Sequence, residues 1–414
     1  MDLLRLSTVG SVDDGKSTLI GRLLFDTKSI FEDQLLAVER ASLRRGNRQM
    51  NLALLTDGLR AEREQGITID VAYRYFATLE RTFIIADTPG HFEFTRNMVT
   101  GASTADVAVV LVDVVRGVVE QSRRHAAIAS LLGVPHLVVC VNKMDLVNFA
   151  AVPFERVRDD FDSFATGLSV ADVTYIPVSA LHGDNVVDRS SRITWYAGPS
   201  LLERLEAVPV SGRYTFEAGR FPIQLVIAAA ADGRQFHGYA GRVEGGIVHT
   251  GDTVTSMRSG RSACVAGIRS SGRLVDEAFP PMSLTLELEP ELDLVRGDML
   301  VSGEPPLAAH RITASLCWMV EQPLTPGRPF TIKHSTRSVA ATCAAIEYRY
   351  DVNTHERHTG VASLELNEIG LAEFRTAEPL FVDRYRTNRA TGSFIVIDDA
   401  THDTAAAGMI ETAS

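Results

Sequence analysis

The sequence predicts a doubly wound α/β domain with a mostly parallel sheet, followed by two antiparallel β-barrels. Three observations lead to this fold class. A glycine-rich stretch, Gly10–Thr18, lies between an apolar segment and a helix-like segment. Strand-like and helix-like segments then alternate as far as about Pro209, as in βαβ units. From about Arg213, apolar residues recur with a period of two between glycine turns, which is typical of antiparallel barrels.

The bulk composition is that of a soluble globular protein. A chain of 414 residues exceeds one ordinary core, so we expect several domains. There is no run of about 18 apolar residues and no secretory cleavage site near the start, so we expect a cytoplasmic protein without membrane contact. The net charge of −11 argues against a nucleic-acid partner. The expected segments are a nucleotide domain at 1–210, barrels at 211–304 and 307–400, and a flexible tail at 401–414.

The cysteines suggest neither a zinc site nor a disulfide framework, because they are far apart and no C-x-x-C occurs. They are Cys140, Cys264, Cys317 and Cys343. Cys140 lies inside the apolar run VVCVNK and is expected to be a small core residue.

The stretch Gly10–Thr18, GSVDDGKST, fits the phosphate-loop pattern G-x-x-x-x-G-K-[ST]. Its glycines let backbone N–H groups wrap a polyphosphate closely. Lys16 is expected to neutralise the β- and γ-phosphates and Ser17 to ligate Mg²⁺. The alternative, a plain turn with a surface lysine, is disfavoured by the strand-like Leu3–Val9 before it and the helix-like Ser17–Leu24 after it, whose dipole favours an anion. The expected triphosphate contacts are Gly10, Ser11, Val12, Asp13, Asp14, Gly15, Lys16, Ser17 and Thr18.

A long polar segment, Asp26–Gln65, follows the first helix, and connections of this length are usually functional or mobile. Thr68 comes shortly after it, at the mouth of the alternating strand Val71–Phe76. A loop in this place can fold over a γ-phosphate and lend a threonine hydroxyl to Mg²⁺. An ordinary loop threonine is the alternative when this residue is taken alone.

The next strand, Thr82–Ala86, leads directly into a second polar turn. Asp87 at the end of that strand is placed to hold Mg²⁺ through water, and the Gly90 backbone N–H can approach the γ-phosphate. His91 can position an attacking water, although a histidine in such a turn can equally be a cap or a core residue. The expected nucleotide contacts in this turn are Asp87, Thr88, Pro89, Gly90 and His91. The expected Mg²⁺ ligands are Ser17, Thr68 and Asp87, and the expected catalytic residues are Lys16, Thr68 and His91.

A third motif follows two further strands. Asp106–Val112 is a continuous apolar run of the kind buried in parallel sheets, Gln121–Leu132 is helix-like, and His136–Val141 is the next strand. The residues after it, Asn142, Lys143, Met144 and Asp145, fit N-K-x-D. The aspartate can accept both the N1–H and the exocyclic amine of guanine, and adenine offers no such pair. The lysine stem can lie along the base, and the asparagine can tie this loop to the phosphate loop.

A fourth motif completes the base site. Ile176–Leu181, IPVSAL, contains a strand and a loop in which the Ala180 N–H can meet the guanine O6. The expected base contacts there are Ser179, Ala180 and Leu181. Each motif alone is weak, but four in this order, each at the carboxyl end of a strand, predict one site for GTP with Mg²⁺. The last helix of the domain is expected at Ser200–Leu205.

Two sets of strand-like runs follow, separated by the joint Glu304–Pro306. Those of the first expected barrel are Phe221–Ile227, Gly241–Val243, Asp252–Met257 and Ser283–Glu289. Those of the second are Ile312–Val320, Phe330–Lys333, Ala341–Tyr350, Gly360–Leu366, Phe381–Tyr385 and Ser393–Ile397.

A guanine-nucleotide domain followed by two barrels resembles the elongation factor Tu branch of the translation-type GTPases over nearly the whole chain. On this comparison Thr68 matches the Mg²⁺-binding threonine of the first switch, and His91 matches the histidine that orients the hydrolytic water. The other matches are Asp87 and Gly90 for the second switch, and Val12 and Ile67 for the apolar gate beside the histidine.

The phosphate loop departs from the translation pattern G-H-V-D-H-G-K, since Ser11 and Asp14 replace its two histidines. This departure argues against a tRNA-carrying role. Four other stretches are similar to the family of large GTPase subunits of bacterial GTP-dependent sulfate adenylyltransferase. They are Phe25–Leu35, Thr56–Phe76, Trp195–Glu206 and Asp383–Asp398.

This second resemblance implies energy coupling. The family forms adenosine 5′-phosphosulfate and pyrophosphate from ATP and sulfate, an uphill reaction that it couples to GTP hydrolysis, and a smaller catalytic partner subunit performs the adenylyl transfer. The sequence agrees, since it contains neither S-G-G-x-D-S nor H-x-G-H. Some relatives are fused to an adenylylsulfate kinase. No second phosphate-loop pattern occurs here, so the chain is either free-standing or separated from such a domain after about Ser414.

Two competing functions remain open from the sequence. One is a translation factor that delivers tRNA, and the other is a GTPase that switches without driving metabolism. Association with aminoacyl-tRNA would favour the first. A GTPase rate indifferent to sulfate, ATP and any partner would favour the second.

Overall fold

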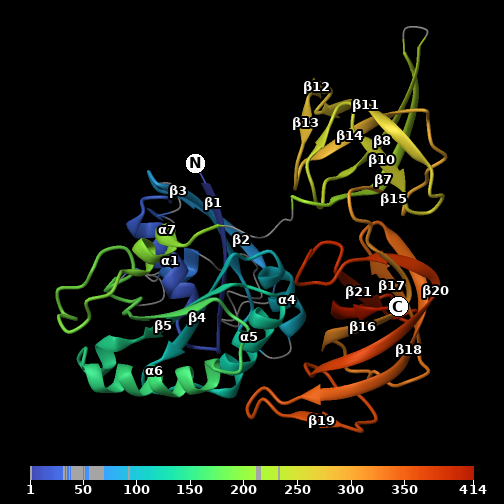
Figure 1. Ribbon diagram of the computed structural model, residues 1–414. Helices are drawn as coiled ribbons and strands as arrows, with labels where there is room; N and C mark the ends of the chain where they lie inside the picture. Colours follow the sequence, from blue (N-terminus) through green and yellow to red (C-terminus); the bar gives the residue numbers. More distant parts are fainter. Residues whose placement is uncertain are drawn as a thin grey trace. The chain divides into compact units, whose positions relative to one another are not determined.

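The computed structural model describes residues 2–30, 33, 35–36, 38, 50, 52–55, 70–91, 94–210, 216–231 and 234–414. Thr68 and Ile67, and with them the predicted first-switch contacts, lie outside the described residues. The chain divides into two compact units, residues 1–210 with 352–355 and residues 211–351 with 356–414 (Figure 1).

The first unit is built on a six-stranded sheet in the order β2-β3-β1-β4-β5-β6. All neighbouring strands are parallel except β2 and β3, which are antiparallel, so the predicted mostly parallel sheet is confirmed. The strands are β1 (Asp2–Gly10), β2 (Ala72–Ala77), β3 (Arg81–Asp87), β4 (Val107–Asp113), β5 (His136–Asn142) and β6 (Asp172–Pro177). The helices are α1 (Lys16–Asp26), α4 (Thr95–Ser103), α5 (Glu120–Leu131), α6 (Ala151–Ala165) and α7 (Leu201–Ala207), with short 3₁₀ turns η1 (Leu52–Leu55) and η3 (Met144–Val147).

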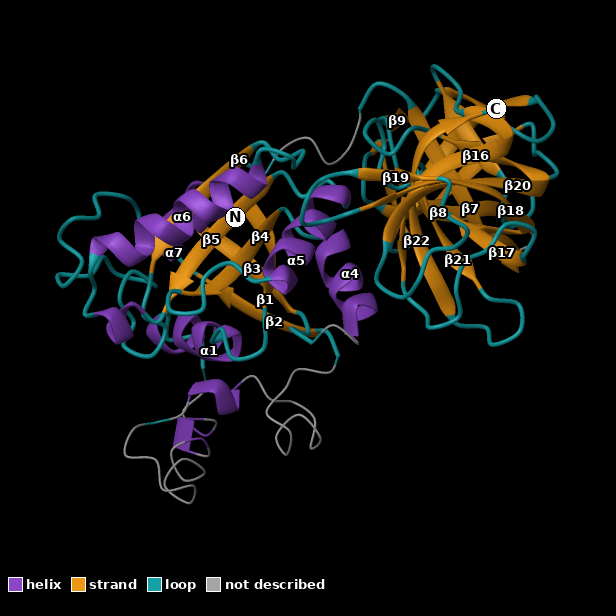
Figure 2. Cartoon of the chain, turned by 90° about the horizontal axis from the view of Figure 1, so that it is seen from below, coloured by secondary structure: helices purple, strands orange, loops and turns teal. Residues whose placement is uncertain are grey.

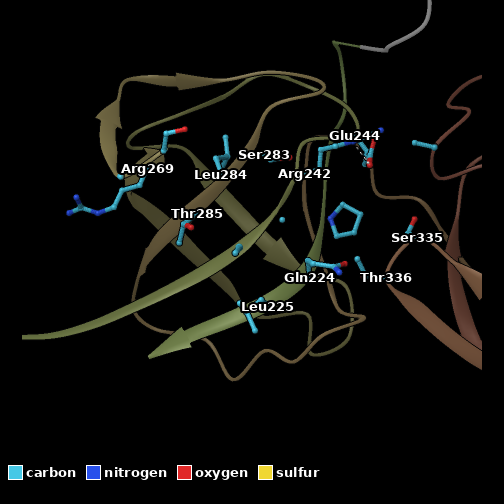
Figure 3. A pocket seen from close by; sticks show the side chains of 16 residues that line it. Gln224, Leu225, Arg242, Glu244, Arg269, Ser283, Leu284, Thr285, Ser335 and Thr336 are labelled. Carbon is cyan, nitrogen blue, oxygen red and sulfur yellow. Dashed lines mark hydrogen bonds and ion pairs between the residues drawn. The ribbon is translucent and has the colours of Figure 1, made fainter. Parts of the chain in front are cut away.

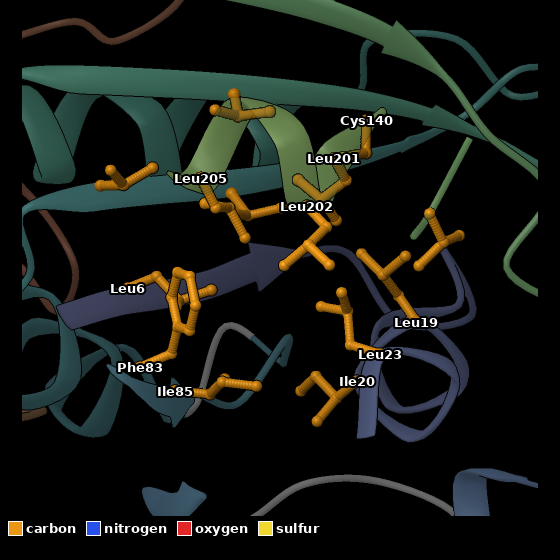
Figure 4. Close-up of a cluster of buried hydrophobic side chains, with 14 of the residues drawn as sticks. Leu6, Leu19, Ile20, Leu23, Phe83, Ile85, Cys140, Leu201, Leu202 and Leu205 are labelled. Carbon is orange, nitrogen blue, oxygen red and sulfur yellow. The ribbon is translucent and has the colours of Figure 1, made fainter. Parts of the chain in front are cut away.

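Helices cover both faces of this sheet, which explains why β4 is fully buried and apolar as far as its last residue, Asp113. α1 and α7 share one hydrophobic core with β1, β3 and β5 (Figure 4). α5 and α6 lie on the side opposite α1 (Figure 2). Cys140 is buried in the core under α7, as predicted. Ser200 begins α7 with a capping box to Glu203, which satisfies backbone donors at the helix start.

The second unit contains two antiparallel barrels, as predicted. The sheet order of the first is β10-β15-β7-β8-β14-β11-β12, and pairing of β10 with β11 closes it. Its strands are β7 (Gly219–Ala231), β8 (Arg234–Arg242), β10 (Thr253–Ser256), β11 (Ser262–Ser270), β12 (Arg273–Val275), β14 (Ser283–Glu289) and β15 (Met299–Ser302), with the small pair β9 (Val248–His249) and β13 (Glu277–Ala278).

The second barrel has the order β17-β21-β22-β16-β20-β18-β19 and is closed by pairing of β17 with β18. Its strands are β16 (Leu307–Trp318), β17 (Pro329–His334), β18 (Arg337–Tyr350), β19 (Arg357–Thr359), β20 (Ile369–Val382), β21 (Ser393–Ile397) and β22 (Thr404–Ala413). The strand predicted at Gly360–Leu366 is wrong, because that segment is irregular and makes only the isolated bridge from Leu364 to Leu324. Of the strand predicted at Phe381–Tyr385, only Phe381 and Val382 are in a strand, as the end of the long β20, and residues 383–385 lie beyond it.

The flexible tail predicted at 401–414 is also wrong. β22 lies between β16 and β21 and pairs with both. Ala406 and Ile410 of this strand belong to the buried core of the barrel. The segment is rich in alanine, which is depleted in strands, so its local preference gave no strand signal, and pairing on both edges overrides that preference.

The two barrels are joined inside their unit by a buried ion pair. Arg220 of β7 donates from Nε and Nη2 to the two carboxylate oxygens of Asp383, at 2.9 and 3.0 Å. The Thr391 hydroxyl donates to the same carboxylate at 2.6 Å. A cavity of about 1000 Å³ also takes lining residues from both barrels (Figure 3). Gln224 and Arg242 come from the first barrel and Ser335 from the second. Arg242 is turned toward its ion-pair partner Glu244.

Candidate nucleotide site

The phosphate loop connects β1 to α1 and depends on a left-handed backbone at Gly15. The φ of Gly15 is +93°, and a Cβ there would come 2.4 Å from Nδ2 of Asn142, so only glycine fits. Asn142 Nδ2 donates to the Asp14 carbonyl oxygen at 2.8 Å. The predicted tie between the N-K-x-D motif and the phosphate loop is therefore present.

Lys16 lies next to Asp87, the residue that ends β3. Lys16 Nζ is 3.1 Å from Asp87 Oδ1, in an ion pair rather than an aligned hydrogen bond. The two residues are 7% and 1% exposed. The structure thus brings the predicted phosphate cation and the predicted Mg²⁺ carboxylate together, with Ser17 in the first turn of α1.

The turn after β3 packs against the phosphate loop. The Thr88 hydroxyl donates to the Thr8 carbonyl oxygen at 2.7 Å, and a Cβ on Gly90 would come 2.6 Å from the Gly10 carbonyl oxygen. Pro89 is buried in the same turn. His91 is partly buried, and its ring centroid lies 6.0 Å from that of Phe94.

The two predicted base motifs are also brought together. The Ser179 hydroxyl donates to Asp145 Oδ1 at 2.6 Å, and the Ala180 N–H donates to Asn142 Oδ1 at 2.9 Å. Met144 is buried, whereas Leu181 is half exposed. The carboxylate and the backbone N–H that were expected to recognise guanine therefore belong to one hydrogen-bonded assembly.

Three residues of this assembly were not predicted. Asp113 ends β4, and its Oδ2 lies 2.8 Å from Lys143 Nζ. Burial opposes ionisation of Asp113, but hydrogen bonds from Lys143 and from the Val115 N–H hold its pKa below the ordinary value. Asp113 follows the same rule as Asp87, a carboxylate at the end of a parallel strand, and that signal was available in the sequence.

Two arginine side chains contact the backbone of the loops around the site, and no sequence motif predicted them. Arg22 of α1 donates from Nε to the Ala180 carbonyl oxygen at 3.2 Å and from Nη2 to that of Leu181 at 2.6 Å. Arg116 donates from Nη1 to the Val12 carbonyl oxygen at 2.8 Å. Both contacts join segments about a hundred residues or more apart, which sequence spacing does not reveal.

Asp14 carries a buried carboxyl group inside the phosphate loop. Its Oδ2 accepts from the Ser11 N–H at 2.8 Å. Burial raises the pKa of Asp14 to about 7, against the lowering effects of that hydrogen bond and of the Arg116 charge.

Apart from Arg22 of α1, these groups lie at or just after the carboxyl ends of parallel strands, where open α/β sheets bind ligands. The phosphate loop, the Lys16 cation and the Asp87 carboxylate form one part of the site, and the Asp145 carboxylate belongs to the other. Such an edge can hold a triphosphate with a divalent cation and a purine base that donates two hydrogen bonds.

Comparison with known proteins defines the class. The GTP-binding domain of elongation factor Tu matches residues 1–212, and the GTP-eEF1A C-terminal domain-like family matches residues 311–411. The chain is therefore an elongation factor Tu-type GTPase.

Curated relatives identify the family within this class of GTPases. The bifunctional enzyme CysN/CysC of Mycobacterium tuberculosis is 53% identical, and the match covers 99% of this chain and 67% of that protein. Sulfate adenylyltransferase subunit 1 of Bacteroides fragilis is 52% identical, with 99% and 86% covered. The chain belongs to the sulfate adenylyltransferase subunit 1 family, and both predicted resemblances are confirmed.

A solved structure shares the fold. The Ski7 GTPase-like domain of S. cerevisiae, bound to GTP, has a TM-score of 0.55 and 18% identity, and the match covers 99% of this chain and 97% of that one. Among the described residues, no helix has the length and apolar character needed to span a membrane.

Proposed function

We propose that this chain is the GTPase subunit of a heteromeric sulfate adenylyltransferase. Hydrolysis of GTP on this chain drives formation of adenosine 5′-phosphosulfate and pyrophosphate from ATP and sulfate on a smaller catalytic partner subunit, in the cytoplasm. The observation that carries the proposal is the convergence of the Lys16–Asp87 pair and the Asp145–Ser179 pair on one edge of a parallel sheet. The family named above supports the assignment of the adenylyl transfer to a complex.

The triphosphate is bound by the backbone of the phosphate loop and by Lys16, which exchanges Asp87 for the phosphates. Ser17, Asp87 and Thr68 are the proposed Mg²⁺ ligands. The fit of a divalent cation rests on Asp87, a buried carboxylate with a cation already beside it. When bound, Mg²⁺ supplies positive charge to the β- and γ-phosphates.

Guanine is selected by Asp145, which accepts from N1–H and from the exocyclic amine. The Ser179 hydroxyl on Oδ1 holds this carboxylate in one orientation, so less rotamer freedom is lost on binding. The Ala180 N–H is engaged by Asn142, so the loop that faces the guanine O6 is rigidly tied to the phosphate loop.

Hydrolysis requires an oriented water, and His91 is the proposed positioning group with Thr68. The Gly90 backbone packs closely on Gly10, and this contact determines the position of the backbone that carries the His91 side chain.

A partner can respond to GTP only through a difference between the GTP and GDP surfaces of this chain. A hundredfold shift of the partner's equilibrium requires about 2.7 kcal/mol of differential affinity, within the usual range for such coupling.

The test is to co-express this chain with a candidate adenylyl-transferring subunit and to assay pyrophosphate release from ATP and sulfate. GTP is expected to raise the yield above that with GDP or a non-hydrolysable GTP analogue. Asp145→Asn in the same complex is the matched control, since it should lose stimulation by GTP and gain stimulation by xanthosine triphosphate. Equal yields with GTP and GDP would remove the coupling role, and association with aminoacyl-tRNA would favour a translation factor instead.

A further inference from the structure

The phosphate loop contains a carboxyl group in a place where negative charge opposes its proposed ligand. Asp14 is 2% exposed and lies two residues before Lys16. A buried carboxylate near a triphosphate suffers both lost hydration and repulsion between like charges. The loop therefore needs a compensating cation if it is to bind GTP with Asp14 ionised.

Arg116 occupies the position that such a cation would need. Its Nη1 lies 3.5 Å from Asp14 Oδ1 and donates to the Val12 carbonyl oxygen at 2.8 Å. One guanidinium thus contacts the loop at two points, one ionic and one on the backbone. Both contacts are made by the same nitrogen, Nη1, and arginine is suited to them because its guanidinium stays charged and each terminal nitrogen carries two N–H donors.

Arg116 is itself held in place by the end of β4. Asp113 Oδ1 accepts from the Val115 N–H at 2.7 Å and, more weakly, from the Arg116 N–H at 3.4 Å. The other oxygen of Asp113 pairs with Lys143. The next residue, Gly117, has a φ of +71°, which lets the chain turn toward α5. Asp113 therefore orients the loop that carries Arg116 and the lysine of the base motif together.

We propose that Arg116 is a positioning residue of the phosphate loop, which neutralises Asp14 and holds the Val12 carbonyl so that the loop accepts a triphosphate. The proposal rests on the proposed function, since it presumes that this loop binds GTP. Arg116 acts through Asp14 and Val12, not by contact with the nucleotide. The Arg116–Asp14 pair also assigns a role to Asp14, which lies where translation-type loops have a histidine.

The charged groups around Asp14 decide how its ionisation responds to loss of Arg116. Asp113 repels its negative charge, whereas Lys143 and Arg116 attract it. On the loop itself, Asp13 is exposed and Lys16 is engaged by Asp87. Without Arg116, the Ser11 N–H and Lys143 remain as the groups that favour the ionised form. GTP binding by an Arg116 variant should then improve as the pH falls and Asp14 takes up a proton.

The experiment titrates a fluorescent GDP analogue and GTP into the full chain between pH 6 and pH 8.5. The variants are Arg116→Ala, Arg116→Lys, Asp14→Asn and the double variant that combines Arg116→Ala with Asp14→Asn. Arg116→Ala is expected to bind about tenfold more weakly at pH 8.5, because the buried Asp14 carboxylate loses its compensating cation, with the deficit shrinking toward pH 6 as Asp14 takes up a proton. Arg116→Lys should recover part of the affinity. The double variant should bind within about threefold of Asp14→Asn alone, because the charge that needs compensation is gone.

The matched control is Arg158→Ala, since Arg158 is a partly exposed arginine of α6 paired with its neighbour Asp159. It should bind like the wild-type chain at every pH. A pH-independent deficit in Arg116→Ala that Asp14→Asn does not relieve would overturn the proposal, because it would indicate packing alone. Wild-type affinity in Arg116→Ala at all pH values would overturn it too. Failure of the wild-type chain to bind GTP would instead refute the proposed function.

Discussion

Lys16 and Asp87 form a buried ion pair with 3.1 Å between Nζ and Oδ1. Removal of the lysine leaves a buried carboxylate without its cation, and such losses cost about 3–5 kcal/mol. Lys16→Ala should therefore lower both the unfolding midpoint and GTP affinity. Lys16→Ala with Asp87→Asn should regain much of the stability but none of the GTP binding. Denaturant unfolding and nucleotide titration on the same samples separate the two effects, and full stability in the single variant would contradict the predicted coupling.

Asp145 is held by the Ser179 hydroxyl at 2.6 Å and is predicted to set base specificity. Asp145→Asn should weaken GTP binding by roughly 1.5–3 kcal/mol for each charged hydrogen bond lost. It should strengthen binding of xanthosine triphosphate, whose C2 carbonyl suits an amide donor. Ser179→Ala is the matched control, with a smaller loss and no change of base. Retention of full GTP preference in Asp145→Asn would show that another residue recognises the base.

His91 follows the glycine that packs on the phosphate loop, and its ring lies near Phe94. If it positions the hydrolytic water, His91→Ala should leave the GTP Kd nearly unchanged and lower kcat roughly 100-fold. His249→Ala, at an exposed histidine in the second unit, should change neither quantity. Simultaneous loss of binding and turnover in His91→Ala would assign the residue a structural role.

The site could be predicted to the extent that one rule describes it. Asp87, Asn142 and Asp113 each end a parallel strand, so sequence order alone places them at one edge. Arg116 obeys no such rule. Its contact with Val12 joins residues 104 positions apart and depends on a turn at the end of β4.

The barrels show how far the sequence could predict the fold. Glycine turns and alternation predicted their class, because both signals are local. β22 is different, since its alanines favour no strand and its position is determined by β16 and β21 on either side. Pairing partners far away in sequence supply information that a local pattern lacks.

Ionisation of Asp14 should be visible in the stability of the chain. Burial raises its folded-state pKa from the ordinary 3.8 to about 7. The native state therefore binds the proton more tightly than the unfolded state, and stability from this group is full below about pH 4 and lost as the pH rises through 7. In nucleotide-free protein, Asp14→Asn should match the wild type near pH 4 and exceed it above pH 7. Parallel profiles of Tm against pH would show that Asp14 does not titrate in this range.

The C-terminal strand β22 is predicted to be essential to the second barrel. Its backbone pairs with β16 and β21, and the Ser414 N–H and carbonyl oxygen bond to Arg311. Ile410 on this strand is 1% exposed, so Ile410→Ala should cost about 2–5 kcal/mol through lost burial and a cavity. Thr412→Ala, at an exposed position of the same strand, should stay within about 0.5 kcal/mol of the wild type. Deletion of residues 404–414 should expose two strand edges and the barrel core, and so unfold the barrel. Thermal unfolding and proteolysis of the three variants measure this, and a fully folded deletion variant would show that the barrel closes without β22.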